Sequence, residues 1–118
     1  MEISNGMDAE NNSSRQDKVS EQLRRIAADF LEMESNKKSL ITVTRATVSK
    51  DLRGSTIFIT VLPESYENNA LSFARRNAGE FRDYVKSKMK LRVLPFFSFE
   101  IDKGEKVRQK IDELGNKK

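Results

Sequence analysis

The chain has 118 residues, enough for one domain with its own core, but only 36% are apolar and 34% are charged, so that core is predicted to be small. It has no cysteine and no histidine, which excludes disulfides and thiolate chemistry and removes the commonest zinc ligand and the commonest neutral-pH general base. No apolar run approaches the roughly 20 residues of a membrane span. We therefore expect a cytoplasmic protein that is not an enzyme and carries neither metal nor cofactor.

Residues 1–16 form a polar segment with too few apolar side chains to order itself. The segment lacks the basic start and apolar run of a signal peptide, and its early acidic residues argue against an organellar transit peptide. We predict a disordered tail here, then one folded domain over residues 17–114, and a short basic end at residues 115–118.

Residues 17–34 are predicted to form the first helix, with Asp17 as its N-terminal cap. Its apolar positions recur at three- and four-residue spacing, which gives one buried face. These positions are Val19, Leu23, Ile26, Ala27, Phe30 and Met33. Residues 35–39 then connect the helix to a strand.

Two strands are predicted next, at residues 40–49 and 55–62, from their content of Val, Ile and Thr. The apolar alternation of the first strand changes parity at residues 44–45. A β-bulge there would bring Val43 and Ala46 both to the core side. The second strand has three inward positions, Ile57, Ile59 and Val61.

A turn at residues 50–54 joins these strands into an antiparallel hairpin. We predict that Gly54 supplies a positive φ at this turn. Lys50 and Arg53 lie at its tip, where they either contact a partner or remain solvated. Pro63 ends the second strand, because proline lacks the N–H that a strand ladder needs.

Residues 66–90 are predicted to form a long helix, because their spacing gives two neighbouring stripes, one apolar and one basic. The apolar stripe is Leu71, Ala74, Ala78, Phe81, Val85 and Met89. The basic stripe is Arg75, Gly79, Arg82, Lys86 and Lys90. We predict a break at Gly79 with a left-handed φ, and Asn77 as the cap of the second half.

Positive charge is concentrated in this helix and the residues after it. Residues 75–92 contain seven basic and two acidic residues, a net charge of +5, whereas the whole chain carries +4. Charge gathered on one element favours a polyanionic partner, the alternative being a solvated helix face. The candidate RNA-binding residues are Arg75, Arg76, Asn77, Ala78, Gly79, Arg82, Lys86, Lys88, Lys90, Arg92, Lys50 and Arg53.

Residues 91–101 are predicted as a third strand in which Phe97 and Phe99 face inward, with Pro95 at an edge or a strand start. Phe96 has the opposite parity, so it either stacks on a base or packs under a neighbouring helix. A short closing helix follows at residues 104–114, with Val107, Ile111 and Leu114 at helical spacing. The element order indicates an α+β fold with helices on one face of a sheet.

Several segments resemble the ribosome-binding factor A family in wording, order and spacing. The resemblance rests on Asn77-Ala78-Gly79 inside a basic helix pair, followed by MKLRVLP at residues 89–95. It extends to VSEQLRR at 19–25, VSKDL at 48–52 and IFITVL at 57–62. Two departures are Asn77, where the family usually has alanine, and residues 35–39, where it usually has an Asp-Pro-Arg loop.

The resemblance implies a KH-like domain of type II with a short C-terminal helix, in which an Ala-x-Gly kink replaces the usual Gly-x-x-Gly loop. It also implies a monomer that binds the immature small (30S) ribosomal subunit and its 16S rRNA precursor. The implied role is late maturation of that subunit, rRNA processing and cold adaptation, in the cytoplasm and without a membrane.

Together, the charge and the resemblance predict recognition of a folded RNA backbone, with phosphate near the N–H groups of Glu80, Phe81 and Arg82. One alternative is a general single-stranded nucleic-acid binder, whose stacking aromatics would be Phe58 and Phe96. A second is a protein-interaction module whose basic face meets an acidic partner. A magnesium-dependent nuclease is disfavoured because the chain has neither histidine nor a compact acidic cluster.

Overall fold

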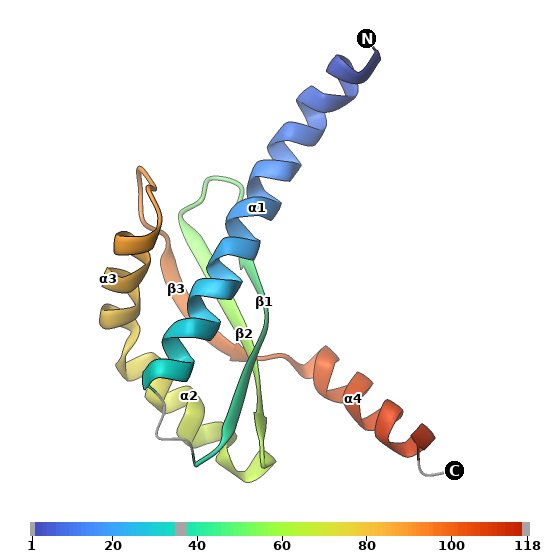
Figure 1. The fold of residues 1–118 in the computed structure, drawn as a ribbon, viewed down its shortest axis with the longest axis vertical. Coiled ribbons are helices and arrows are strands. Elements are labelled where there is room, and N and C mark those ends of the chain that lie inside the picture. Colours follow the sequence, from blue (N-terminus) through green and yellow to red (C-terminus); the bar gives the residue numbers. More distant parts are fainter. Residues whose placement is uncertain (1, 35–37, 117–118) are drawn as a thin grey trace.

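The computed structural model describes residues 2–34 and 38–116, with side chains for residues 15–33 and 38–109. The rest of the predicted connector and basic end (residues 35–37 and 117–118) lies outside the described residues. The described part is an α+β fold in which three helices pack on one face of a three-stranded sheet and a fourth extends from its end (Figure 1).

The first helix, α1 (Glu2–Glu34), starts earlier than predicted, and its N-terminal half projects past the sheet (Figure 1). Extending an existing helix costs much less than nucleating one, and the residues before Asp17 contain no proline to stop it. The residues predicted as a tail therefore continue α1, while the domain boundary at residue 17 stays a prediction. Gln16 ties α1 to the sheet, because its Nε2 donates to the Val48 carbonyl at 2.7 Å.

The buried face of α1 differs from the predicted face at Ile26, which is half-buried, and at the C-terminal end of the helix. Met33 is 58% exposed, whereas Leu31 is 1% exposed and packs in the core. Met33 continues the predicted three- and four-residue spacing, but at the end of α1 that side of the helix turns away from the sheet. The confirmed buried positions are Val19, Leu23, Ala27 and Phe30.

The hairpin of β1 (Leu40–Val48) and β2 (Gly54–Leu62) confirms the predicted strands and their antiparallel pairing. The register shifts between Val43 and Arg45, which confirms the predicted β-bulge. Val43 and Ala46 are both buried on the helix side of the sheet, as the bulge requires. The three predicted inward residues of β2, Ile57, Ile59 and Val61, are also buried.

The turn between these strands is built differently from the prediction. Gly54 does not have a positive φ; Leu52 has one, at 61°. Ser49 organises the turn, since its Oγ accepts from the N–H groups of Arg53 at 3.1 Å and Gly54 at 3.0 Å. Because the Ser49 hydroxyl satisfies these two backbone N–H groups, the turn can hold Leu52, a residue other than glycine, in the left-handed conformation.

The third strand, β3 (Phe96–Ile101), is shorter than predicted and runs parallel to β2, with sheet order β1-β2-β3. Buried Pro95 immediately precedes it, which confirms a strand start at an edge. The N–H groups of Phe96 and Asp102 donate to Arg53 and Ile59 carbonyls of the β2 side at 2.7 and 2.8 Å. Because alternate residues point their backbone groups the same way, those of residues 97, 99 and 101 face the free edge.

After the short 3₁₀ turn η1 (Glu64–Tyr66), the predicted long helix is two helices, α2 (Glu67–Arg76) and α3 (Ala78–Lys88). They are separated at Asn77, not at Gly79, so the predicted site of the break is wrong. Gly79 lies in the first turn of α3 without a positive φ. Asn77 does not cap α3 with its side chain; its Nδ2 donates backwards to the Phe73 carbonyl at 2.8 Å and closes α2.

Phe81 of α3 is the centre of the core. Its ring is fully buried and lies 5.4 Å from Phe30 of α1, 4.8 Å from Phe97 and 5.6 Å from Phe99 of β3, measured between ring centroids. One side chain thus joins α1, α3 and β3, and fixes α3 beside the free edge of the sheet.

The last helix, α4 (Lys103–Asn116), confirms the predicted closing helix and extends slightly beyond it at both ends. Val107 is 58% exposed, and the side chains of Ile111 and Leu114 lie outside those described. Asp102 starts the helix, because its Oδ1 accepts from the N–H of Glu105 at 3.0 Å.

Candidate nucleic-acid interface

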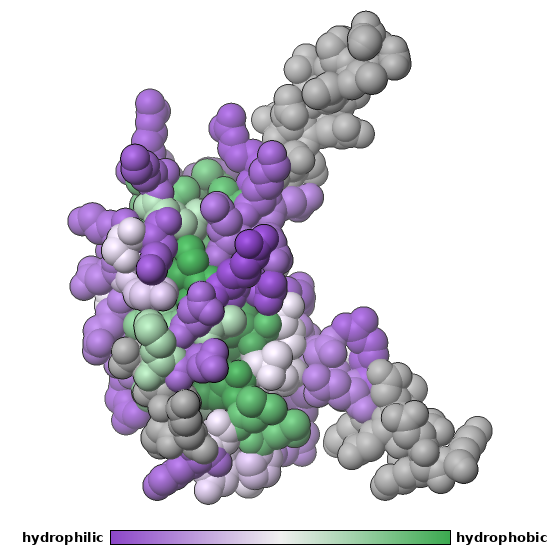
Figure 2. Space-filling view, viewed as in Figure 1, coloured by the Kyte–Doolittle hydropathy of each residue, from purple (hydrophilic) through white to green (hydrophobic). Residues whose placement is uncertain are grey.

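Seven cationic side chains of α2, α3 and the loop before β3 are exposed, and we call them the basic track. They are Arg75, Arg76, Arg82, Lys86, Lys88, Lys90 and Arg92. The neighbouring apolar stripe turns inward, with Ala74, Phe81, Val85 and Met89 buried. Figure 2 shows hydrophilic side chains over α3 and over the end of the molecule where the hairpin and the loop before β3 lie.

Arg75 follows the free edge of β3. Its Nη2 donates to the outward-facing carbonyl of Phe99 at 3.0 Å and lies 3.9 Å from a carboxylate oxygen of Glu100. The side chain is nevertheless 54% exposed. Arg75 therefore protects an unpaired edge carbonyl while leaving much of its guanidinium accessible.

Arg82 lies at the other end of the same edge, where its Nη2 is 3.5 Å from the Leu94 carbonyl. Lys88 extends along α3 with its Nζ 5.4 Å from the centroid of the Tyr84 ring. The basic track thus runs from the α2–α3 junction, beside β3, to the loop that starts this strand (Figure 1).

The α2–α3 junction presents Asn77 and Ala78 half-buried and Gly79 exposed. The first turn of a helix leaves its leading N–H groups without intrahelical partners, and here these belong to Ala78, Gly79 and Glu80. The predicted set, residues 80–82, was two residues too late, since the Phe81 N–H already donates to the Asn77 carbonyl at 2.9 Å. Glu80 places a carboxylate in this turn and opposes an anion there.

The two cations of the hairpin tip, Lys50 and Arg53, are exposed and join one end of the basic track. The link is the parallel pairing of β2 with β3, in which the Phe96 N–H donates to the Arg53 carbonyl at 2.7 Å. Asp51 lies close by, and its carboxylate is 3.9 Å from Arg53 Nε. A hydrogen bond from the Ser49 hydroxyl and another from the Arg53 N–H lower the pKa of Asp51, so it stays anionic at this tip.

Two features lie on the opposite, helix-free face of the sheet: the first was not predicted, and the second is one of the two placements predicted for Phe96. The guanidinium of Arg45 lies 3.9 Å from the centroid of the Phe58 ring and 3.2 Å from Asp102 Oδ2. Phe96, for which two placements were open, does not pack under a helix and is 79% exposed. The position of Arg45 could have been predicted from the parity change in β1, because the β-bulge turns this side chain to the open face.

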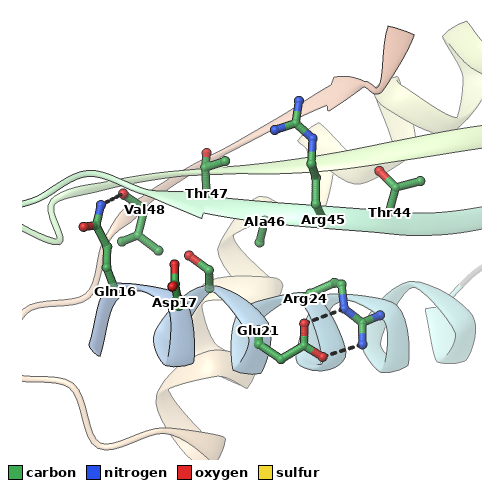
Figure 3. Close-up of a pocket in the computed structure, with 10 residues that line it drawn as sticks. Gln16, Asp17, Glu21, Arg24, Thr44, Arg45, Ala46, Thr47 and Val48 are labelled. Atoms are coloured by element: carbon green, nitrogen blue, oxygen red, sulfur yellow. Dashed lines mark hydrogen bonds and ion pairs between the residues drawn. The ribbon is translucent and has the colours of Figure 1, made fainter. Parts of the chain in front are cut away.

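A groove of about 470 Å³ lies between α1 and β1 (Figure 3). Glu21 lies beside it and accepts two hydrogen bonds from Arg24, at 2.9 and 2.7 Å. These bonds, assisted by Arg25, lower the pKa of Glu21 to about 2. The groove lies across the sheet from the basic track and brings none of the predicted site residues together.

Within the described residues, no three His, Cys, Asp or Glu side chains gather closely enough to hold a metal ion. The same part of the chain has no helix with the length and apolar character needed to cross a membrane.

The element order, the parallel edge strand and the two helices beside it define a KH-like domain of type II with a basic face. The model of the family described as ribosome-binding factor A matches residues 15–115, and this chain belongs to that family.

Individual relatives agree with this assignment. Ribosome-binding factor A of Alkalilimnicola ehrlichii is 31% identical over 104 residues, which cover 81% of this chain and 80% of the relative. Its counterpart in Macrococcus caseolyticus is 28% identical over 113 residues, covering 90% of this chain and 99% of the relative.

Solved structures share the fold. The crystal structure of ribosome-binding factor A from Thermus thermophilus has a TM-score of 0.67 at 22% identity, covering 73% of this chain and 93% of that one. A model of the Thermus thermophilus factor fitted into an electron cryomicroscopy map of its complex with the 30S subunit has a TM-score of 0.60 at 23% identity, covering 68% and 87%.

Proposed function

We propose that this chain is a ribosome biogenesis factor that binds the immature 30S subunit through the backbone of its 16S rRNA precursor. It assists late maturation of that subunit by binding, without catalysing a reaction. The observation that carries this proposal is the basic track, since seven exposed cations along one sheet edge match a polyanionic strand. Membership of the family and the 30S complex of a structural relative support the choice of polyanion.

The geometry suggests which contacts with RNA each residue of the basic track makes. Arg75 is held by its hydrogen bond to the Phe99 carbonyl, so less side-chain entropy is lost when it binds phosphate, whereas Arg82 makes only a long contact with the Leu94 carbonyl. Lys86 and Lys90 are exposed and can follow the RNA backbone. The N–H groups of Ala78 and Gly79 add donors at the start of α3. Contacts of these kinds read charge and shape, with little base specificity.

The same proposal gives the protein a cytoplasmic location and a monomeric state, and a role in rRNA processing and in growth at low temperature. The support for these points is membership of the ribosome-binding factor A family.

Sedimentation of a cell lysate at low salt tests the proposal. The protein is expected to travel with small subunits, mainly immature ones, and much less with 70S particles. A triple variant, Arg82→Ala with Lys86→Ala and Lys90→Ala, should move to the top of the gradient. The matched control removes three exposed cations elsewhere, Lys18, Arg25 and Lys103, and should sediment as the wild type does.

The protein-interaction alternative predicts a different result. A basic face that meets an acidic protein would retain its partner after ribonuclease treatment, and the purified complex would contain no RNA. Wild-type protein that stays at the top of a low-salt gradient would refute binding to the subunit.

A further inference from the structure

Phe96 is a large aromatic side chain without a role in the core. The other two aromatic residues of β3, Phe97 and Phe99, face the core and are 8% and 1% exposed, whereas Phe96 is 79% exposed. It points to the helix-free face because successive residues of a strand alternate between faces. Its register partner in β2 is Gly54, which has no side chain to cover the ring.

The next register pair on the same face supplies hydrogen-bonding groups. Thr56 is paired with Ser98, and their hydroxyl oxygens are 3.3 Å apart. Either hydroxyl can donate or accept, so the pair suits donors and acceptors on the edge of a nucleobase. Both groups lie one step along the sheet from the exposed ring.

The second aromatic ring of this face is already occupied. Phe58 lies one register pair further on, opposite Glu100, and the Arg45 guanidinium covers it at 3.9 Å from the ring centroid. Of the two rings, only Phe96 therefore offers an open π-face.

Three exposed cations lie on the chain segments next to Phe96. Arg53 is joined to it by the backbone hydrogen bond of 2.7 Å, Lys50 lies on the same tip, and Arg92 lies in the loop that leads into β3. Asp51 is paired with Arg53, and Glu100 is near Arg75. An exposed ring, adjacent hydroxyls and flanking cations together match the base, polar edge and phosphates of a nucleotide.

We propose that this end of the open sheet face binds one unpaired nucleotide of single-stranded RNA. Its base stacks on Phe96, its polar edge faces Thr56 and Ser98, and its phosphates meet Arg53 and Arg92. The inference rests on the proposed function in that the strand belongs to RNA, but the base lies on the open face of the sheet, and Arg92 is the one residue that this site shares with the basic track.

The test measures binding of a single-stranded RNA octamer containing 2-aminopurine to the full chain. Stacking on an aromatic ring quenches the fluorescence of this base. Because one stacked base contributes about 1–3 kcal/mol, Phe96→Ala should weaken binding about fivefold or more and abolish the quenching. Phe96→Tyr should keep both. Val93→Ala, which removes a similarly exposed apolar side chain from the preceding loop, should change neither.

Three results would overturn the inference. One is unchanged affinity and quenching in Phe96→Ala. Another is wild-type behaviour of Phe96→Leu, since an apolar contact without stacking would then be sufficient. The third is a Phe96→Ala protein that binds the octamer normally yet leaves the 30S subunit, because its ring would then meet a ribosomal protein.

The inference and the proposed function fail separately. Quenching that depends on Phe96, in a protein that does not sediment with small subunits, supports the nucleotide site and refutes the 30S role. Normal sedimentation without any quenching supports the 30S role and refutes the nucleotide site. Thermal melting of each variant confirms that the exposed substitutions leave the fold intact.

Discussion

Asp102 links β1 to α4 through one carboxylate. It is 6% exposed, and its Oδ2 accepts from Thr44 Oγ1 at 2.5 Å and from Arg45 Nε at 3.2 Å, while Oδ1 accepts from the Glu105 N–H at 3.0 Å. Burial alone would raise the pKa of Asp102, but these hydrogen bonds outweigh it and hold the pKa below its usual value. The β-bulge of β1 is thereby fastened to the start of α4.

Asp102→Asn should lower the free energy of unfolding at neutral pH by about 2 kcal/mol, because the amide loses the charge-assisted bonds. The native pKa is depressed, so the carboxylate stabilises the fold above its unfolded-state pKa of roughly 4, and this contribution disappears as pH falls through the native pKa. The gap between wild type and variant should therefore narrow in acid.

Urea unfolding at neutral pH and at roughly pH 3 measures this gap. Glu100→Gln is the control, since that carboxylate is 56% exposed and 3.9 Å from Arg75, where an ion pair contributes little. An equal loss at both pH values would show that Asp102 acts through its shape and not its charge.

Phe81 and Arg82 are neighbours with opposite roles. Phe81→Ala should destabilise the protein by about 3–5 kcal/mol, because it empties the site where three aromatic rings meet. Arg82→Ala should change stability by less than about 0.5 kcal/mol, because the side chain is exposed and its one backbone contact is long. The same variant should weaken RNA binding by about 1 kcal/mol. Chemical denaturation and RNA titration separate the two effects, and a destabilised Arg82→Ala would contradict the division into faces.

At the scale of elements, local pattern was sufficient for β1 and β2 but not for the start of β3 or the helix break. The parity change in β1 predicts its bulge, because only a bulge buries both halves of the apolar alternation. The break between α2 and α3 depends instead on which residue terminates α2. Asn77 does so by bonding back to the Phe73 carbonyl, a choice that sequence alone does not distinguish from capping α3.

Gly79→Ala should raise the free energy of unfolding by up to about 1 kcal/mol, the usual advantage of alanine at a helical position. Gly79 has no positive φ, and an added Cβ would meet no atom within 4 Å. Subunit association should be unchanged, since alanine keeps the backbone N–H.

Gly104→Ala is the matched comparison, because it also lies in a first helical turn and its Cβ would make only an ordinary contact, 3.6 Å from Asp102 Oδ1. Thermal melting of both variants decides the point. If Gly79→Ala is destabilised while Gly104→Ala is stabilised, the helix is kinked at Gly79 after all.

At the scale of the whole molecule, the candidate site depends on a pairing between distant segments. The cations of α2 and α3 could be predicted from sequence because helical spacing places them together. The approach of Arg53 to the start of β3 could not, since it requires β2 and β3 to pair in parallel with Gly54 opposite Phe96. The isolation of Phe96 on the open face also follows from that register.

Positive charge is unevenly distributed across the fold. The basic track follows the β3 edge, whereas α1 covers the β1 side and its described side chains are balanced in charge, with Asp17, Glu21, Asp29 and Glu32 against Arg15, Lys18, Arg24 and Arg25. Such an uneven distribution orients a protein in the field of a polyanion, with the basic edge leading.

Binding through this edge should therefore depend strongly on salt. With about four to six phosphates neutralised, the logarithm of the association constant should fall with the logarithm of salt concentration at a slope of about −3 to −5. Lys86→Ala should make the slope shallower by about 1, because one fewer counterion is displaced from the RNA. Lys18→Ala on α1 removes the same charge from the other side of the sheet and should leave the slope unchanged. Titrations of immature subunits at several salt concentrations measure it. Equal changes in both variants would mean that RNA responds to net charge alone, and that the edge beside β3 does not form the interface.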